Sequence, residues 1–161
     1  MHSEVLNSIK QSLQQELSVK EALYRICSII EIQLDKYNWV GFYFMNHQSR
    51  KLHLGPYIGA PTDHTIIDFG KGICGQVAES GESFLVDDVN AQSNYIACSI
   101  DVKSEIVVPM YYKDQLIGQI DIDSNTIAAF DHRDDAFLKE VNRLIVDRYQ
   151  EELIEYLEEL I

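Results

Sequence analysis

The sequence predicts an α+β domain in which an antiparallel sheet of about six strands is flanked by N-terminal and C-terminal helices. Apolar residues recur with the helical period at both ends of the chain, β-branched and aromatic runs fill the middle, and two of these runs are joined by only two residues. A length of 161 residues is ordinary for one domain. We therefore expect a single domain over residues 1–161, divided into an N-terminal helix (1–19), a core (20–130) and a C-terminal helix (131–161).

Two amphipathic helices are expected at the start of the chain, between Ser3 and Leu34, with a break near Ser18. Apolar residues at spacings of three and four carry this prediction: Val5, Leu6, Ile9, Leu13 and Leu17, followed by Leu23, Ile26, Cys27 and Ile30. Because Cys27 falls on the apolar stripe of the second helix, we assign it to the core.

The region between Tyr37 and Ser124 predicts the sheet. Its β-branched and aromatic runs are NWVGFYF, KLHLGPYI, SFLVDDV, SEIVVPMYY and QLIGQIDID. Only Lys113 and Asp114 separate the last two runs, and so short a connection joins antiparallel strands but not parallel ones.

The C-terminal region predicts one long helix that begins at Asp131, a good N-cap residue type. Its apolar positions are Phe137, Val141, Leu144, Ile145, Tyr149, Leu153 and Leu157. This stripe and the stripe of residues 1–17 are longer than one sheet face needs, so we expect a homodimer through the terminal helices.

The charge balance excludes several classes of partner. The chain has 26 acidic and 13 basic residues, and its net charge of −13 repels the phosphates of nucleic acids and anionic lipids. The N-terminus lacks the pattern of a signal peptide, and no apolar run approaches the length of a membrane span. The three cysteines have no paired short spacing. We therefore expect a cytoplasmic protein with reduced thiols and no nucleic-acid or membrane partner.

The segment GKGICG at residues 70–75 matches the spacing G-x-G-x-x-G of dinucleotide-binding proteins. That motif requires a parallel βαβ unit, whereas the following runs resemble antiparallel strands and the helix after the glycines is barely two turns long. The sequence therefore disfavours a nucleotide site, and we expect no cofactor.

The same segment places Cys74 at the start of a short helix that Gly81 ends. A helix N-terminus favours the thiolate, although most free cysteines are small buried hydrophobes, the more common interpretation for Cys74 alone. Cys98 lies in the polar, loop-like stretch NYIACSIDVKSE. The separation of 24 residues permits the two thiols to meet at one end of the sheet without requiring it.

Three carboxylates form the other candidate cluster. Asp121 and Asp123 share one strand face by the period of two, and Glu105 begins the neighbouring run. A solvated sheet face is the ordinary explanation of such a pattern in an acidic protein. Trp39 and Tyr43 favour a cavity instead, because residues four apart on a strand share a face and supply an aromatic wall.

Taken together, the motifs YNWVGFY, LGPYIGAP, FGKGICG, VDDV, NYIACSIDVKSEIVVP and LIGQIDIDS resemble the GAF-domain family of free methionine-(R)-sulfoxide reductases, over roughly residues 20–150. The resemblance implies a GAF-like fold and thiol-dependent reduction of free methionine-(R)-sulfoxide to methionine. It also implies the site residues: Cys98 as the nucleophilic thiol, Glu105, Asp121 and Asp123 in the substrate pocket, and Trp39 and Tyr43 as its aromatic wall.

The implied chemistry needs a thiolate and an acid together. Cys98 attacks the sulfoxide sulfur while a carboxyl group kept protonated by its like-charged neighbours, with Glu105 in the catalytic set, donates to the oxygen. The resulting sulfenic acid requires a second thiol. The family commonly has a cysteine where this chain has His64, so either Cys74 takes that role, with thioredoxin as the reductant, or a small thiol attacks directly.

Two alternative functions remain open from the sequence alone. One is a GAF domain that binds and reports a small molecule without turnover; the missing cysteine and the long terminal helices favour it, and the lack of an output domain in this chain counts against it. The other is a metal site built from His64, Cys74 and Cys98 with His47 or His53. These residues lack the short paired spacing of ordinary zinc motifs, so we expect no metal.

Overall fold

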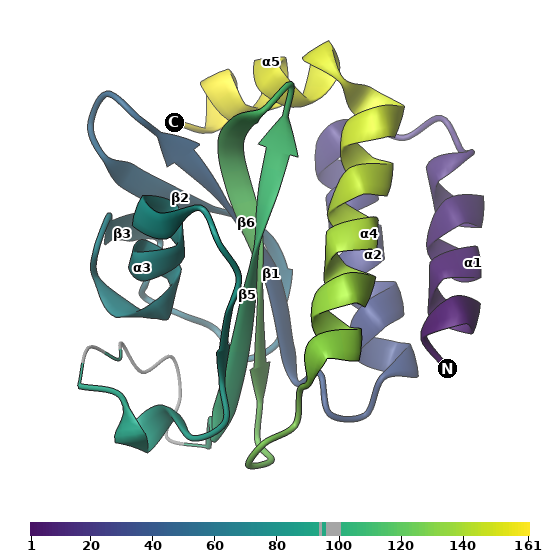
Figure 1. The fold of residues 1–161 in the computed structure, drawn as a ribbon. Helices are drawn as coiled ribbons and strands as arrows, with labels where there is room; N and C mark the ends of the chain where they lie inside the picture. The colour runs from purple at the N-terminus through teal and green to yellow at the C-terminus, as the bar shows by residue number, and fades with distance from the viewer. Residues whose placement is uncertain (94, 96–100) are drawn as a thin grey trace.

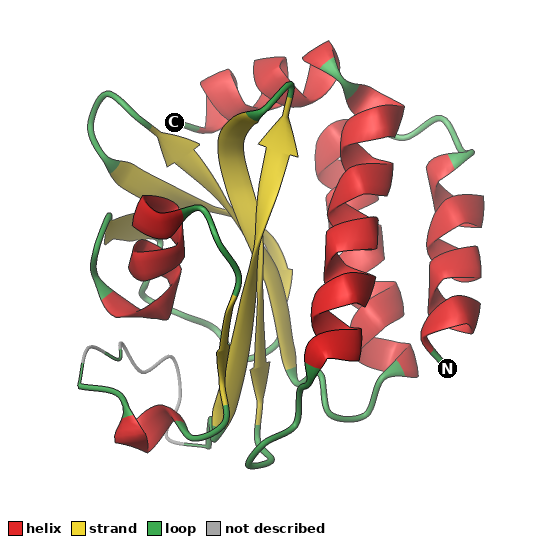
Figure 2. Cartoon of the chain, viewed as in Figure 1, coloured by secondary structure: helices red, strands yellow, loops and turns green. Residues whose placement is uncertain are grey.

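The computed structural model describes residues 1–93, 95 and 101–161 and confirms the predicted α+β class (Figure 1). A six-stranded antiparallel sheet lies between helices (Figure 2). Along the chain the elements are α1 (His2–Leu13), α2 (Val19–Gln33), β1 (Trp39–Asn46), β2 (Lys51–Ile58), β3 (Ile66–Asp68), α3 (Gly72–Ser80), β4 (Phe84–Val86), the 3-10 turn η1 (Val89–Ala91), β5 (Ser104–Tyr112), β6 (Gln115–Ser124), α4 (His132–Tyr149) and α5 (Glu151–Leu160).

The strand order in the sheet is β3-β2-β1-β6-β5-β4, so β1, β6 and β5 occupy its centre and the two short strands its edges. β3 has three residues and was not among the predicted runs, because so short a segment has no readable alternation. The run SFLVDDV forms only the three-residue strand β4, since Asp88 then caps the turn η1 by accepting a hydrogen bond from Asn90 N–H.

The two faces of the sheet are covered differently. Helices α1, α2 and α4 lie on one side and α3 on the other (Figure 1). Because side chains alternate along a strand, β1 sends Val40, Phe42 and Phe44 into the core on the side of α2 and α4, and sends Trp39 and Tyr43 toward α3. The same strands therefore build the main core and a second, smaller space beneath α3.

The N-terminal helices follow the prediction. Ser18 lies between α1 and α2 and caps α2, since its side chain accepts a hydrogen bond from Glu21 N–H. Cys27 is fully buried on α2, where its thiol donates to the carbonyl of Pro56, and burial raises its pKa. The assignment of Cys27 to the core is confirmed.

The prediction of a single C-terminal helix from the apolar spacing is wrong, because the helix is broken at one residue. Gln150 has a φ of +50° and separates α4 from α5, although no glycine or proline marks the position. α5 then runs across one end of the sheet, where the ring of Tyr156 packs edge-on against Phe44 at 5.8 Å between centroids (Figure 1). The predicted start is correct, because Asp131 caps α4 in a capping box with Asp134.

The β5–β6 hairpin contains a bulge that sets the register of the site. Lys113 and Asp114 form the two-residue turn, both with positive φ, as a type I′ turn requires. Next to the turn Tyr111 pairs with Leu116, but further along Met110 pairs with Gly118, so Ile117 is an extra residue on β6.

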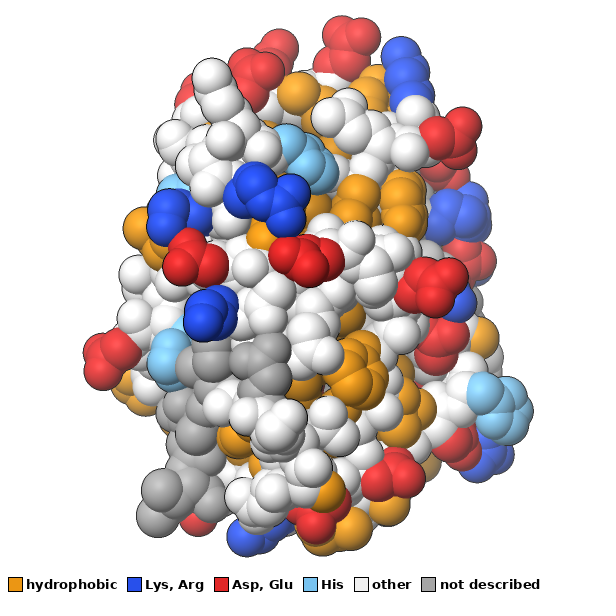
Figure 3. Space-filling view, turned by 60° about the vertical axis from the view of Figure 1, so that its left-hand side comes forward, with side chains coloured by type: hydrophobic (Ala, Val, Ile, Leu, Met, Phe, Trp, Pro, Cys, Tyr) orange, Lys and Arg blue, Asp and Glu red, His pale blue; other side chains and the backbone are white. Residues whose placement is uncertain are grey.

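No helix among the described residues is long and apolar enough to cross a membrane. On the face that Figure 3 shows, acidic and basic side chains are interspersed with apolar ones.

Candidate functional site

The structure brings five of the predicted site residues onto the sheet face beneath α3. In the strand ladder, Trp39 on β1 pairs with Asp123 on β6, and Asp123 pairs in turn with Glu105 on β5. Asp121 lies two positions from Asp123 on β6 and Tyr43 lies four positions from Trp39 on β1, so both are on the same face. Cys98 lies outside the described residues.

The three carboxylates are buried, so they do not form the solvated sheet face that was their ordinary explanation. The exposed fraction is 5% for Glu105 and 1% for each of Asp121 and Asp123. Glu105 is in hydrogen-bonding contact with both aspartates, and a contact between two carboxyl groups becomes a hydrogen bond only when one of them is protonated. Without such a proton, Asp121 Oδ1 and both oxygens of Asp123 have no donor among the described residues.

Burial raises the pKa values of the two aspartates in this cluster. The loss of solvation raises the pKa of Asp121, and it raises the pKa of Asp123 well above the usual value, with a further increase from the charge of Asp121. The hydrogen-bonding contact with Glu105 lowers the pKa of both aspartates and so offsets part of this increase. The cluster therefore retains a proton more readily than exposed carboxyl groups do.

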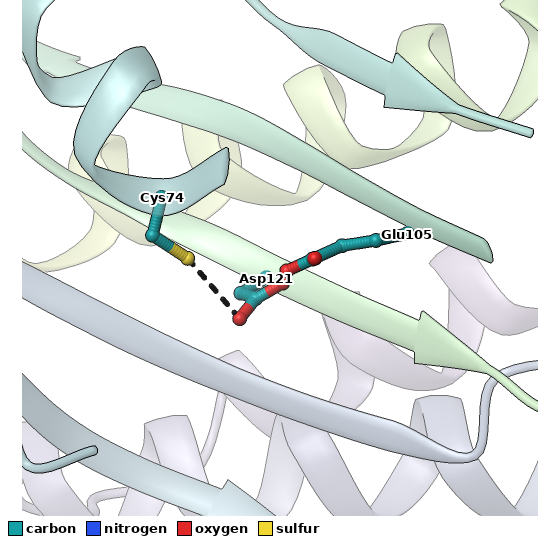
Figure 4. A group of neighbouring side chains, drawn as sticks. All are labelled: Cys74, Glu105 and Asp121. Carbon is teal, nitrogen blue, oxygen red and sulfur yellow. Dashed lines mark hydrogen bonds between the residues drawn. The ribbon is translucent and has the colours of Figure 1, made fainter. Parts of the chain in front are cut away.

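Cys74 is the third residue of α3 and points from the helix toward the carboxylates (Figure 4). Its side chain is 5% exposed, and its thiol donates a hydrogen bond to Asp121 Oδ2 at 3.2 Å. Burial, followed by the charges of Asp121 and Glu105, raises the pKa of this thiol well above the usual value. This burial agrees with the more common interpretation of Cys74 as a small buried hydrophobe, because desolvation and the acids outweigh the helix dipole that would favour a thiolate.

The aromatic wall is larger than the sequence predicted. The Trp39 ring stacks on Tyr43 at 6.5 Å and on Tyr57 at 5.1 Å, and Tyr57 was not predicted. The indole N–H of Trp39 donates to the carbonyl of Ala60. Gly41, between Trp39 and Tyr43, leaves room for the indole, since a Cβ there would lie 2.5 Å from it.

A small cavity of about 20 Å³ opens between α3 and the sheet. Its lining consists of Tyr43, His64, Ile67, Lys71, Gly72, Ile73, Cys74, Glu105 and Asp121. Such a volume holds about one water molecule, so an amino acid enters only if lining side chains shift. Lys71, at the start of α3, was not identified from the sequence, although it stands inside the segment GKGICG.

Of the three histidines considered from the sequence, His64 lines this cavity and the other two do not. Tyr43 donates its hydroxyl proton to the backbone carbonyl of His64 at 2.9 Å, which holds that loop against the aromatic wall. His47 contacts the carbonyl of Leu116, and neither His47 nor His53 lines the cavity. A larger groove of about 770 Å³ lies between α4, β5 and the segment that follows α3, and none of the predicted site residues lines it.

Replacing Asp123 with asparagine should stabilise the fold at neutral and alkaline pH. The native pKa of Asp123 lies above its unfolded value, so its contribution to stability is complete at low pH and is lost as the pH rises through the native pKa. The asparagine side chain cannot ionise, so the variant does not lose this stability as the pH rises. Melting temperatures from about pH 5 to about pH 9 test this, with a rise of roughly 2–4 °C per kcal/mol gained.

Glu158→Gln is the matched control for this pH series, because Glu158 is an exposed carboxylate on α5. Its melting temperature should follow that of the parent protein across the series. An Asp123→Asn variant with no gain in melting temperature toward alkaline pH would contradict the assigned cost of burying this charge.

Comparison with known proteins supports a specific family. A family model described as GAF domain matches residues 16–147. Free methionine-R-sulfoxide reductase of Saccharomyces cerevisiae is 43% identical over 110 residues, which are 67% of this chain and 61% of the yeast protein. The Escherichia coli protein of the same name is 32% identical over 126 residues, covering 78% of this chain and 74% of that protein.

The fold is also similar to that of a solved relative. The structure of free methionine-R-sulfoxide reductase from Neisseria meningitidis in complex with its substrate has a TM-score of 0.88 and 33% sequence identity. The match covers 96% of this chain and 91% of that one.

Proposed function

The chain belongs to the GAF domain family and has relatives named free methionine-R-sulfoxide reductases, and on this premise we propose that it reduces free methionine-(R)-sulfoxide to methionine. The observation that carries the proposal is the buried cluster of Glu105, Asp121 and Asp123 beside Trp39 and Tyr43. Burying three acids is costly, and a cationic or hydrogen-bonding ligand offsets that cost.

The amino-acid part of the substrate is recognised by its charges. The ammonium group binds Asp121 and Asp123, which are deeply buried and lack an ion-pair partner among the described residues. The substrate carboxylate lies toward the first turn of α3, where Lys71 and the positive end of the helix dipole favour an anion. Trp39 contacts the sulfoxide end of the side chain.

The reaction reduces the sulfoxide and oxidises Cys98. The Cys98 thiolate attacks the sulfoxide sulfur while Glu105 donates a proton to the sulfoxide oxygen, so a bond forms between the two sulfurs, the S–O bond breaks and the oxygen leaves as water. Water then attacks the Cys98 sulfur and breaks the bond between the two sulfurs, which leaves Cys98 as a sulfenic acid. Methionine leaves with its sulfur reduced by two electrons. Glu105 suits the role of donor because it contacts both buried aspartates at the substrate pocket.

A second thiol then reduces the sulfenic acid, releasing water and forming a disulfide. His64 replaces the cysteine commonly found in the family, and Cys27 is buried in the core, so Cys74 is the protein thiol available for this step. Asp121 Oδ2 accepts the hydrogen bond of the Cys74 thiol and is placed to take its proton when Cys74 attacks. Thioredoxin or a small thiol completes the cycle.

Oxidation by one equivalent of substrate without reductant should link Cys74 to Cys98. Peptide mapping by mass spectrometry detects the crosslink, and Cys74→Ser is the control that cannot form it. If the parent protein instead accumulates an uncrosslinked Cys98 sulfenic acid or mixed disulfide, Cys74 does not act in recycling and small thiols complete the reaction.

The decisive test of the proposed function is an epimer-resolved assay. The purified protein is incubated with dithiothreitol and with each sulfoxide epimer of free methionine, and methionine is quantified. Turnover of the R epimer alone supports the reductase. Binding of a sulfoxide without turnover would instead support the second candidate, a GAF small-molecule sensor, which the replacement of a family cysteine by His64 favours.

We also propose that the protein is a cytoplasmic homodimer that associates through its terminal helices. Ile9 and Leu13 are buried within the chain against α2 and α4, but Leu6 and Leu17 are only partly buried, and Ile32 on α2 is 71% exposed. A reducing compartment keeps the thiols in the state that the reaction requires.

Deleting residues 1–17 should weaken this dimer, because the deletion removes apolar helix surface and exposes the sides of α2 and α4 that α1 covers. Light scattering over a concentration series measures the molar mass of both forms. A stable monomer before and after the deletion would refute the proposed dimer.

A further inference from the structure

We propose that Cys74, Glu105 and Asp121 form a binding site for a zinc-type divalent cation, which occupies the cavity beneath α3 in competition with the substrate. One donor atom from each residue, a sulfur and two carboxylate oxygens, lies within 4.8 Å of the others. The three side chains come from α3, β5 and β6 and converge on one point (Figure 4). The competition with substrate rests on the proposed function, whereas the cation site itself does not.

The spacing of the donors fits first-row metal coordination. Usual zinc–sulfur and zinc–oxygen bond lengths, combined at a tetrahedral angle, separate the two donor atoms by about 3.5 Å. In the structure Cys74 Sγ and Asp121 Oδ2 are 3.2 Å apart, joined by a proton that a cation would replace. A shift of a few tenths of an ångström therefore converts the hydrogen bond into two metal bonds.

The chemistry of the donors selects among cations. Magnesium and calcium prefer oxygen ligands alone, whereas zinc, cobalt and cadmium accept a thiolate together with carboxylates. Three protein ligands leave a fourth position, which a water molecule takes in open zinc sites. The cavity of about 20 Å³ has room for the one water molecule that would take this fourth position.

Unpartnered oxygens provide a second, independent observation that points to a cation. When Glu105 is ionised, as a metal ligand is, Asp121 Oδ1 and both oxygens of Asp123 are buried without a donor among the described residues, and the aspartates are 1% exposed. Lys71 is the one Lys or Arg among the described residues that line the cavity, and its exposed side chain is free to turn toward solvent. A bound cation would compensate the buried negative charge.

Sequence spacing does not reveal this site. Its donors come from a helix and two strands, with Cys74 and Asp121 separated by 47 positions in the chain, and they include no histidine. Motif searches detect ligands paired within a few residues, as in zinc fingers. The metal hypothesis from the sequence was therefore built on a different set of side chains, of which only Cys74 belongs here.

Cobalt is the probe that tests the proposal without requiring turnover. The reduced protein, freed of small thiols, is titrated with Co²⁺ while sulfur-to-cobalt charge-transfer absorption is recorded in the near ultraviolet, and Zn²⁺ is then added. We expect a saturable band with one cobalt per chain that Zn²⁺ abolishes. Free methionine sulfoxide should weaken Co²⁺ binding if both occupy the same cavity.

Single substitutions assign the ligands. Cys74→Ser should abolish the band, and Glu105→Gln, which keeps the sulfur, should weaken Co²⁺ binding at least about tenfold. Cys27→Ser and Cys98→Ser are matched controls that remove the other two thiols, and both should keep the band. Circular dichroism verifies that each variant is folded.

The proposal is overturned if no band forms, or if Cys98→Ser removes the band while Cys74→Ser keeps it. It is also overturned if Glu105→Gln binds Co²⁺ as tightly as the parent protein. If the protein reduces the sulfoxide but shows no cobalt band, the proposed function stands and the cation site is refuted. If it shows the cobalt band but does not reduce the sulfoxide, the cation site stands and the proposed function is refuted.

Discussion

Serine in place of Cys98 should lower sulfoxide reduction by at least about a thousandfold while leaving the fold intact. An alcohol is a far weaker nucleophile than a thiolate at neutral pH, and it cannot be oxidised to a sulfenic acid. The substitution is nearly isosteric, so substrate binding should change little. Methionine formation with dithiothreitol measures turnover, and the shift of intrinsic tryptophan fluorescence on adding sulfoxide measures binding, because Trp39 is the one tryptophan of the chain.

Cys27→Ser is the matched control for Cys98→Ser. Cys27 lies in the core on the other side of the sheet from the cavity, and a serine hydroxyl can keep the hydrogen bond to the carbonyl of Pro56. This variant should retain turnover per folded molecule. Parental activity in the Cys98 variant, or its loss in the Cys27 variant, would mean that the nucleophile is wrongly assigned.

Glu105→Gln should lower kcat by about 10²- to 10⁴-fold with a small effect on KM, because the amide keeps the shape of the side chain but supplies no carboxylic proton. Asp123→Asn should instead raise KM, since it removes an anion that binds the substrate ammonium. Asp121→Asn should also raise KM and, in addition, alter the environment of the Cys74 thiol, which donates to this carboxylate.

Steady-state kinetics on the R epimer separates these effects. Glu158→Gln, which changes an exposed carboxylate on α5, controls for the loss of one negative charge and should match the parent protein. Three cavity variants with parental kcat and KM would remove Glu105, Asp121 and Asp123 from the proposed mechanism.

Much of this arrangement follows from the sequence because strand periodicity is a strong signal. The period of two placed Asp121 and Asp123 on one face and Trp39 and Tyr43 on one face, and the structure has both pairs beneath α3. The break near Ser18 followed from the apolar spacing of the two helices, and the helix start at Asp131 followed from cap chemistry. These features depend on residues close together in the chain.

Features that depend on distant contacts were not predictable. The break at Gln150 has no local sign, since α5 turns there to pack on α2 and β1. The sequence favoured a buried Cys74, which the structure has, but it did not reveal the hydrogen bond of this thiol to Asp121, because the two residues are 47 positions apart in the chain. Tyr57 joins the site because β2 pairs with β1, and Lys71 joins it because α3 begins beside the cavity, and no short motif encodes either arrangement.

The bulge at Ile117 determines which residue of β6 lies opposite Glu105 in the site. If pairs are counted outward from the Lys113–Asp114 turn without the extra residue, Glu105 falls opposite Ile122, a core residue on the side of α2 and α4. The odd residue moves Glu105 opposite Asp123 and so onto the face beneath α3. If β6 slid by one residue along β5 to absorb the bulge, Glu105 would face Ile122 in place of Asp123, whereas removing Ile117 itself would leave Glu105 opposite Asp123.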